Sequence, residues 1–165
     1  MATKEQQQAA ATEKLVKHID EAYAMEQNVL RMLDDMITST DDDEMRRELE
    51  AHKKQTERQA DRLKKRLDAH DAEPSMVKEA GGILGALMKG VVDMARSDKP
   101  GRNARDGFAT EHMEIASYEL LERVARRAGD TETANVAREN RKEEREMARK
   151  IAANWDKVAD LTMES

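Results

Sequence analysis

The chain has 165 residues, a formal net charge of −6 at pH 7, 38% hydrophobic and 39% charged residues, and no cysteine. This length fits one domain, and the lack of thiols excludes disulfides and zinc–thiolate sites, so any metal must be bound by oxygen or imidazole. The negative charge argues against a nucleic-acid-binding protein. The sequence has no apolar run that could form a signal peptide or cross a membrane, so a cytoplasmic location is expected.

The first two predicted helices form a hairpin. Residues 1–11 are polar and are expected to be a flexible segment. Apolar residues at spacings of three and four then predict a helix over residues 12–38. A run of serine, threonine and aspartate residues follows and supplies N-cap side chains and favourable negative charge, so a second helix is predicted over residues 43–71.

Residues 73–102 form a long connection after this hairpin. They are predicted to contain a short, glycine-bearing helix over residues 74–96, followed by a loop over residues 97–102. Antiparallel neighbours need only a short turn, so a connection of this length suits a crossing from one end of a bundle to the other.

The last two predicted helices form a second hairpin. One helix is predicted to end at Ala128 with Gly129 as its C-cap, and the next two residues offer N-cap side chains for a helix over residues 131–161. Residues 162–165 are expected to be a tail. Two hairpins joined by a long crossover predict an all-α, ferritin-like four-helix bundle over residues 12–161.

Each long helix carries an inward stripe that is apolar toward its ends and polar near its middle. An unpaired carboxylate in a core costs several kcal/mol or takes up a proton, so carboxylates converging from separate helices need a compensating positive charge. Four-helix bundles supply it with dinuclear iron or manganese sites built from carboxylates and imidazoles. The polar residues of the stripes include Glu26, His52, Gln59, Glu111, Tyr118, Asn140 and Glu144, with Glu114 adjacent to the third stripe.

Each of these residues taken alone has a simpler explanation. Glu26 can pair with a lysine or arginine at the edge of its stripe, and a lone His52 is more often a hydrogen-bonded core histidine. Glu111 and Glu114 can be solvated charges, and Tyr118 can donate its hydroxyl to a buried carboxylate. The similar depth of the polar positions in all four helices favours the metal site.

The polar segments are also the part of the chain that resembles a known family. They resemble the YciE/YciF family of ferritin-like proteins, and the similarity extends over about residues 12–161, with TEHMEIASYELL as its most specific stretch. The resemblance implies a rubrerythrin-type bundle, often dimeric, with a carboxylate-bridged dinuclear metal site and a role in bacterial stress responses. The segments read YAMEQNVL (23–30), EAHKKQTERQADRL (50–63), ATEHMEIASYELLERVARRAGD (109–130) and RKEEREMARKIAANWD (141–156).

The resemblance also implies roles for individual residues. This sequence departs from the family pattern at three positions. Relatives usually carry a glutamate at the position of Gln55, can carry a histidine at Gln59, and place aspartate or histidine at Ala148. Because an amide binds iron more weakly than a carboxylate does, the sequence leaves two ions, one ion and an empty site open. The implied ligands are Glu26, His52, Glu111, Glu114 and Glu144, and the residues expected beside them are Gln55, Gln59, Tyr118 and Asn140.

Two kinds of function follow from these residues. The first is a stress-related ferritin-like metalloprotein that binds iron or manganese and handles oxygen, peroxide or ferrous iron, with no catalytic residue assigned. The second is a non-enzymatic helical stress or interaction protein whose metal site has degenerated. A homodimer is the expected assembly in both cases.

Overall fold

The computed structural model describes residues 3–75 and 99–164, and over these ranges the protein is helical with no strand. This agrees with the predicted all-α class. The short helix predicted over residues 74–96 lies almost entirely outside the described ranges. The helices are α1 (Lys4–Ser39), α2 (Asp43–Ala69), α4 (Lys99–Ala128), α5 (Thr131–Ala153) and α6 (Trp155–Glu164).

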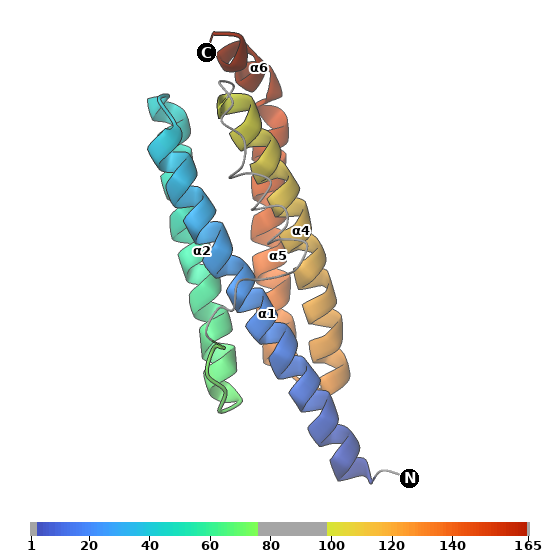
Figure 1. Ribbon diagram of the computed structural model, residues 1–165. Helices are drawn as coiled ribbons and strands as arrows, with labels where there is room; N and C mark the ends of the chain where they lie inside the picture. Colours follow the sequence, from blue (N-terminus) through green and yellow to red (C-terminus); the bar gives the residue numbers. More distant parts are fainter. Residues whose placement is uncertain (1–2, 76–98, 165) are drawn as a thin grey trace.

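The four long helices are arranged as two antiparallel hairpins, α1 with α2 and α4 with α5 (Figure 1). Helix α1 also packs on α4, and α2 packs on α5. Helix α2 ends at one end of the bundle, and α4 begins at the opposite end. The chain must therefore cross the length of the bundle between the hairpins, which is the connectivity of the predicted ferritin-like bundle.

Helix α1 begins eight residues earlier than the sequence analysis predicted. Thr3 is its N-cap: the Thr3 hydroxyl accepts from the Gln6 N–H at 3.2 Å, and the Gln6 side chain accepts from the Thr3 N–H at 2.9 Å. This capping box satisfies two of the free N–H groups of the first turn. Residues 4–11, expected to be flexible, are therefore the first turns of a helix that reaches Ser39.

The beginning of α4 also differs from the prediction. Residues 99–102 were expected to lie in a loop, but the helix begins at Lys99 and includes Pro100 and Gly101. Proline is tolerated in the first turn because the first N–H groups of a helix have no intrahelical partner. A side chain at Gly101 would meet Thr162 of α6, whose Oγ1 lies 2.8 Å from the position of an added Cβ. This glycine therefore lets α6 approach α4 closely.

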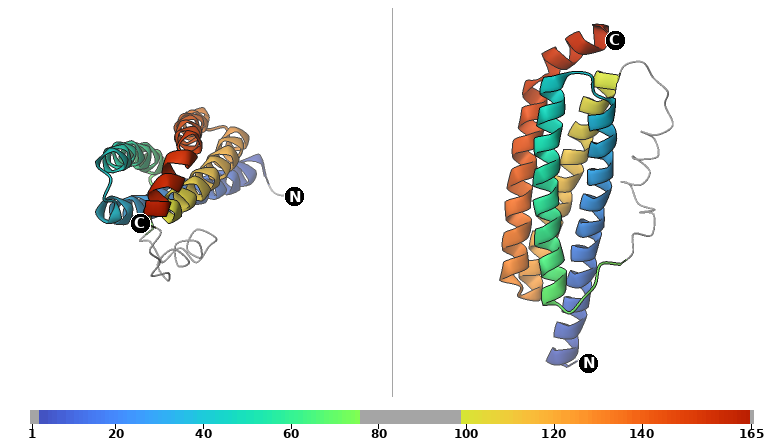
Figure 2. Two further views of the ribbon diagram at one scale, coloured as in Figure 1. Left: turned by 90° about the horizontal axis from the view of Figure 1, so that it is seen from above. Right: turned by 90° about the vertical axis from the view of Figure 1, so that its left-hand side faces the viewer.

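The C-terminal helix was predicted as one element over residues 131–161, and the structure divides it into α5 and α6. Asn154 separates them with φ −108° and ψ 9°, and its N–H donates to the Ile151 carbonyl at 3.0 Å. Helix α6 then turns across the end of the bundle and packs on α4 (Figure 2). It extends to Glu164, so most of the predicted tail is helical.

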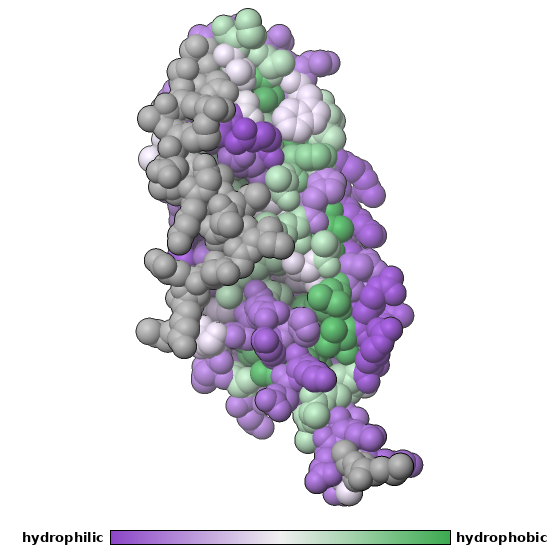
Figure 3. All heavy atoms as spheres, turned by 45° about the vertical axis from the view of Figure 1, so that its right-hand side comes forward, coloured by the Kyte–Doolittle hydropathy of each residue, from purple (hydrophilic) through white to green (hydrophobic). Residues whose placement is uncertain are grey.

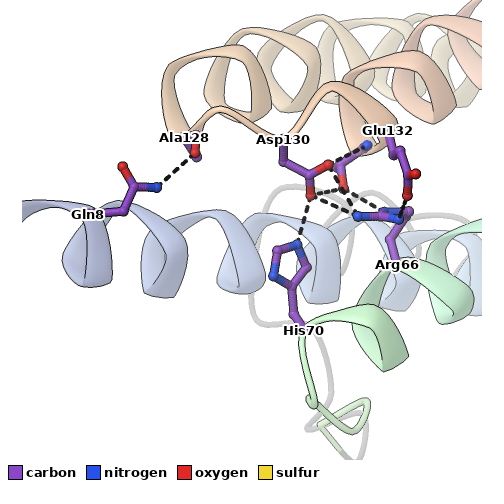
Figure 4. Close-up of polar contacts among 7 residues, drawn as sticks. Gln8, Arg66, His70, Ala128, Asp130 and Glu132 are labelled. Atoms are coloured by element: carbon purple, nitrogen blue, oxygen red, sulfur yellow. Dashed lines mark hydrogen bonds and ion pairs between the residues drawn. The ribbon is translucent and has the colours of Figure 1, made fainter. Parts of the chain in front are cut away.

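A polar cluster joins the C-terminal end of α2 to the turn between α4 and α5 (Figure 4). Gly129 ends α4 with φ +79°, and Asp130 caps α5 by accepting from the Thr133 N–H at 2.9 Å, as the sequence predicted. The Asp130 carboxylate also accepts from Arg66 at 3.1 Å and lies 2.7 Å from His70 Nε2. One aspartate therefore caps a helix and anchors the neighbouring hairpin.

The interior consists of two apolar clusters with a polar layer between them. One cluster includes Leu15, Ile19, Leu63 and Leu121, and the other is built around the second half of α1, from Val29 onward. The polar layer matches the predicted change from apolar to polar along each stripe. On the outside, charged side chains surround smaller apolar areas (Figure 3), and no helix in the described ranges is both long and apolar enough to span a membrane.

Candidate metal centre

The polar layer brings together side chains from all four long helices. Every one of them is at most 5% exposed, so they lie in the core and not on a solvated face. Helix α1 supplies Glu26, α2 supplies His52 and Gln59, α4 supplies Glu111, Glu114 and Tyr118, and α5 supplies Asn140 and Glu144. Because Glu111 and Glu114 are buried, they are not solvated charges on the outside of the bundle.

The possible ligand atoms form two groups that share one carboxylate. In the first group, atoms of His52, Glu111 and Glu144 lie within 4.8 Å of one another, and in the second, atoms of Glu26, Glu114 and Glu144 do the same. Glu144 belongs to both groups. A carboxylate shared in this way can bridge two cations, whereas each group by itself has three donors for one cation.

Several atoms in the layer have no hydrogen-bond partner. These atoms are one oxygen of each of the four glutamates, both ring nitrogens of His52 and the amide oxygen of Gln59. His52 Nε2 does lie 3.0 Å from Glu111 Oε1, but without the geometry of a hydrogen bond. Buried polar atoms in native proteins are nearly always paired. All of these atoms are acceptors except one His52 nitrogen, which carries the ring proton. A set of unpaired acceptors in one layer is the arrangement that a bound cation would satisfy.

Burial changes the acidity of these groups. It raises the pKa of Glu111 to about 8, and together with the charge of Glu111 it raises the pKa of Glu144 to about 9. The pKa values of Glu26 and Glu114 are also raised well above the ordinary value, first by burial and then by Glu144. Burial lowers the pKa of His52. Without a cation, the carboxyl groups therefore retain protons near neutral pH, and a divalent ion would displace those protons.

A chain of hydrogen bonds holds Glu26 from the other side. The Tyr118 hydroxyl donates to Glu26 Oε1 and accepts from Asn140 Nδ2 at 3.0 Å. The Asn140 carbonyl in turn accepts from Arg62 at 2.8 Å, and Arg62 donates to both oxygens of Glu143. Tyr118 therefore donates to a buried carboxylate, as one of the simpler explanations proposed, and this contact orients one of the possible ligands.

The two glutamines that depart from the family pattern lie in different places. Gln59 is fully buried, and its amide nitrogen donates to Glu144 Oε1, so it orients the shared carboxylate. Gln55 is only half-buried and lines a cavity beside His52 and Glu111. Ala148 is buried and supplies no ligand. Gln59 is therefore hydrogen-bonded to a possible ligand, whereas Gln55 lines the cavity that His52 and Glu111 also line.

Arg62 lies in a part of α2 that is rich in lysine and arginine, a pattern typical of a solvated helix face. The structure places it at 22% exposure against Asn140, Glu139 and Glu143. The spacing of three residues from Gln59 is the signal that could have shown that Arg62 points inward.

The donor set fits a cation with a preference for oxygen ligands. Four carboxylates, one imidazole and the Gln59 carbonyl oxygen are available, and four negative charges balance two divalent ions. The two positions are unequal, because among the described residues only the group with Glu111 includes an imidazole.

Comparison with known proteins places this arrangement in a family. Residues 10–164 match the family model described as "Domain of unknown function (DUF892)". The chain belongs to this family. It is similar to the Xanthomonas campestris protein XCC3681, with 27% sequence identity and a TM-score of 0.80 over 93% of this chain and 97% of that chain.

Two further solved structures share the fold. One is the Escherichia coli stress protein YciF, with 18% identity and a TM-score of 0.76 over 94% of this chain and 98% of that chain. The other is Desulfovibrio desulfuricans bacterioferritin, whose structure was determined to describe its diiron site, with 17% identity and a TM-score of 0.78 over 94% of this chain and 85% of that chain. These similarities confirm the ferritin-like fold and the predicted family resemblance.

Proposed function

We propose that this protein is a ferritin-like stress protein that binds iron in the polar layer and uses it to handle oxygen, peroxide or ferrous iron. The observation that carries the proposal is the pair of donor groups that share Glu144, because their unpaired acceptors come from all four helices. The E. coli stress protein and the diiron bacterioferritin with the same fold support it.

Each residue of the layer has a role in this proposal. Glu144 would bridge two ions, His52 and Glu111 would hold one of them, and Glu26 and Glu114 would hold the other. Iron held by these residues would supply electrons for the reduction of oxygen or peroxide.

Neighbouring side chains orient these ligands. Tyr118 holds Glu26, Asn140 holds Tyr118 and is itself held by Arg62, and Gln59 holds Glu144. Because these contacts are already formed in the protein, the ligands need little rearrangement on binding.

Metal analysis after loading with ferrous iron, and separately with manganese, tests the proposal. The wild-type chain should retain one or two ions after gel filtration, and Glu114→Gln and Glu144→Gln should each lose metal, with the greater loss for Glu144→Gln because this carboxylate belongs to both groups. Glu122→Gln is a matched control, since Glu122 is buried on the same helix as Glu114 but is paired with Arg126 and Arg141. Equal metal in all four proteins would refute the site.

A second function is favoured by one contact in the site. Gln59 donates a hydrogen bond to Glu144, and the buried Ala148 supplies no ligand. Both features fit a polar layer whose carboxyl groups are neutralised by protons instead of a metal ion. In that case the protein would be a non-enzymatic structural protein. A chelator would then leave the melting temperature unchanged, whereas removal of a metal that binds only the folded state lowers it.

A further inference from the structure

A cavity of about 240 Å³ lies between the helices at the end of the bundle where α6 crosses it. Figure 1 shows α2 standing apart from α4 and α5 toward this end. Over the described residues its walls are mainly apolar and include four methionines, so we call it the methionine cavity. These methionines are Met32, Met36, Met45 and Met147.

The methionine cavity reaches the polar layer at its inner end. His52 and Glu111 both line it, and both are buried. The two ring nitrogens of His52 and the Oε2 atom of Glu111 have no hydrogen-bond partner. The cavity therefore combines an apolar wall with unpaired polar atoms at one end, which is the usual composition of a small-molecule site.

The size and charge of the cavity define what it can hold. An apolar cavity of about 150 Å³ accommodates benzene, so about 240 Å³ accommodates a benzene ring with a few additional heavy atoms. A charged head group would have to be buried beside the Glu111 carboxyl group. Moving a charge into such a site is costly. Two lysines line the cavity: Lys157 is already paired with Glu44 at 2.5 Å, and Lys150 is exposed, so its charge is solvated. An uncharged molecule is therefore favoured.

We propose that the methionine cavity binds a small uncharged organic molecule, about the size of a substituted benzene. Its apolar body lies against the methionines, and its single hydroxyl-type oxygen faces His52 and Glu111. The inference builds on the proposed function in one respect: the bound molecule lies beside the residues that would hold the metal, so the substrate of that site is organic. Binding itself needs no metal.

The test uses the full-length, metal-free protein labelled with ¹³C at its methionine methyl groups. The probe is 2-phenyl-2-propanol, which has a phenyl ring and one hydroxyl group. Titration should shift the methyl signals of the four cavity methionines with one common saturation curve. Met25, Met113 and Met163 do not line the cavity and provide internal controls. Benzoate, of similar size but charged, should cause no saturable shift.

Two substitutions on α4 then locate the binding site. Ala104 lines the cavity, so Ala104→Phe should weaken probe binding by at least about tenfold, which corresponds to about 1.4 kcal/mol. Ala109 is exposed on the same helix, so Ala109→Phe should leave binding unchanged. If Ala104→Phe fails to fold, the pattern of shifts in the wild-type protein still decides the question.

The outcomes separate this inference from the proposed function. The absence of shifts at the cavity methionines, or equal shifts at all methionines, overturns the cavity proposal even if the protein binds iron. Selective shifts in a protein that binds no iron support the cavity and refute the metal site. Saturable binding of benzoate would refute the requirement for an uncharged molecule.

Discussion

The protonated carboxyl groups of the polar layer predict an unusual dependence of stability on pH. In the unfolded chain a glutamate titrates near 4.5, whereas burial raises the pKa of Glu111 to about 8 and of Glu144 to about 9. Between pH 4.5 and about 8, the folded, metal-free protein retains protons that the unfolded chain has released. The free energy of unfolding must therefore fall as the pH rises through this window.

The magnitude follows from the number of protons retained. Each such carboxyl group lowers the free energy of unfolding by about 1.4 kcal/mol per pH unit. Glu111 alone thus accounts for a few kcal/mol between pH 5 and 8. The lowered pKa of His52 acts in the opposite direction, but only below its ordinary value of 6.5. Glu119 has a lowered pKa and contributes stability that is lost below 4.5, outside the window.

Urea unfolding of the chelated protein, followed by circular dichroism between pH 5 and 8, measures this dependence. Stability should decline toward pH 8, and the double variant Glu111→Gln and Glu144→Gln should make the decline shallower because neither amide titrates. Glu26 and Glu114, whose pKa values are also raised, should account for the remaining decline. Loading with iron should reverse the slope, since metal binding requires deprotonated carboxylates. A chelated wild-type protein that is as stable at pH 8 as at pH 5 would refute the reasoning.

Three further predictions concern single residues. Tyr118→Phe removes the hydroxyl that donates to Glu26 and should cost about 1–3 kcal/mol in urea unfolding, whereas Tyr23→Phe, at a half-buried tyrosine outside the layer, should cost less. Asp130→Ala removes the cap of α5 and the partner of Arg66, so the free energy of unfolding should fall by about 1–3 kcal/mol. An unchanged urea midpoint would contradict a stabilising role for the contacts drawn in Figure 4. Gly129→Ala should cost about 1 kcal/mol, because φ is +79° although no atom lies within 4 Å of the added Cβ. Finally, sedimentation equilibrium tests the expected homodimer against the chain mass of 18.7 kDa.

Local chemistry determined where several helices begin and end. Gly129 and Asp130 were predicted from sequence because a left-handed C-cap and an aspartate N-cap depend only on adjacent residues. Proline and glycine at the start of α4 were misinterpreted as a loop, since proline is compatible with both a loop and a first helical turn. The break at Asn154 carried no comparable local signal, and α6 packs on α4, which is distant in sequence.

Periodicity determined which side chains face inward. The stripes placed Glu26 and Glu144 in the core because a spacing of three and four residues defines one face of a helix. Periodicity does not define how far one helix slides along its neighbour or how it is rotated. The sharing of Glu144 between two groups and the close approach of His52 to Glu111 follow from that placement, so only the tertiary structure decided them.

The amino-acid sequence by itself determined an all-α bundle of two hairpins with a polar layer across its core. The tertiary structure decided which partners meet in that layer. It directed Gln59 to Glu144 and Gln55 to the methionine cavity, and it turned Arg62 inward against Asn140. The physical reason is that the spacing of apolar residues defines the inward face of each helix separately, whereas ligand geometry and cavity shape arise only where separate helices pack together.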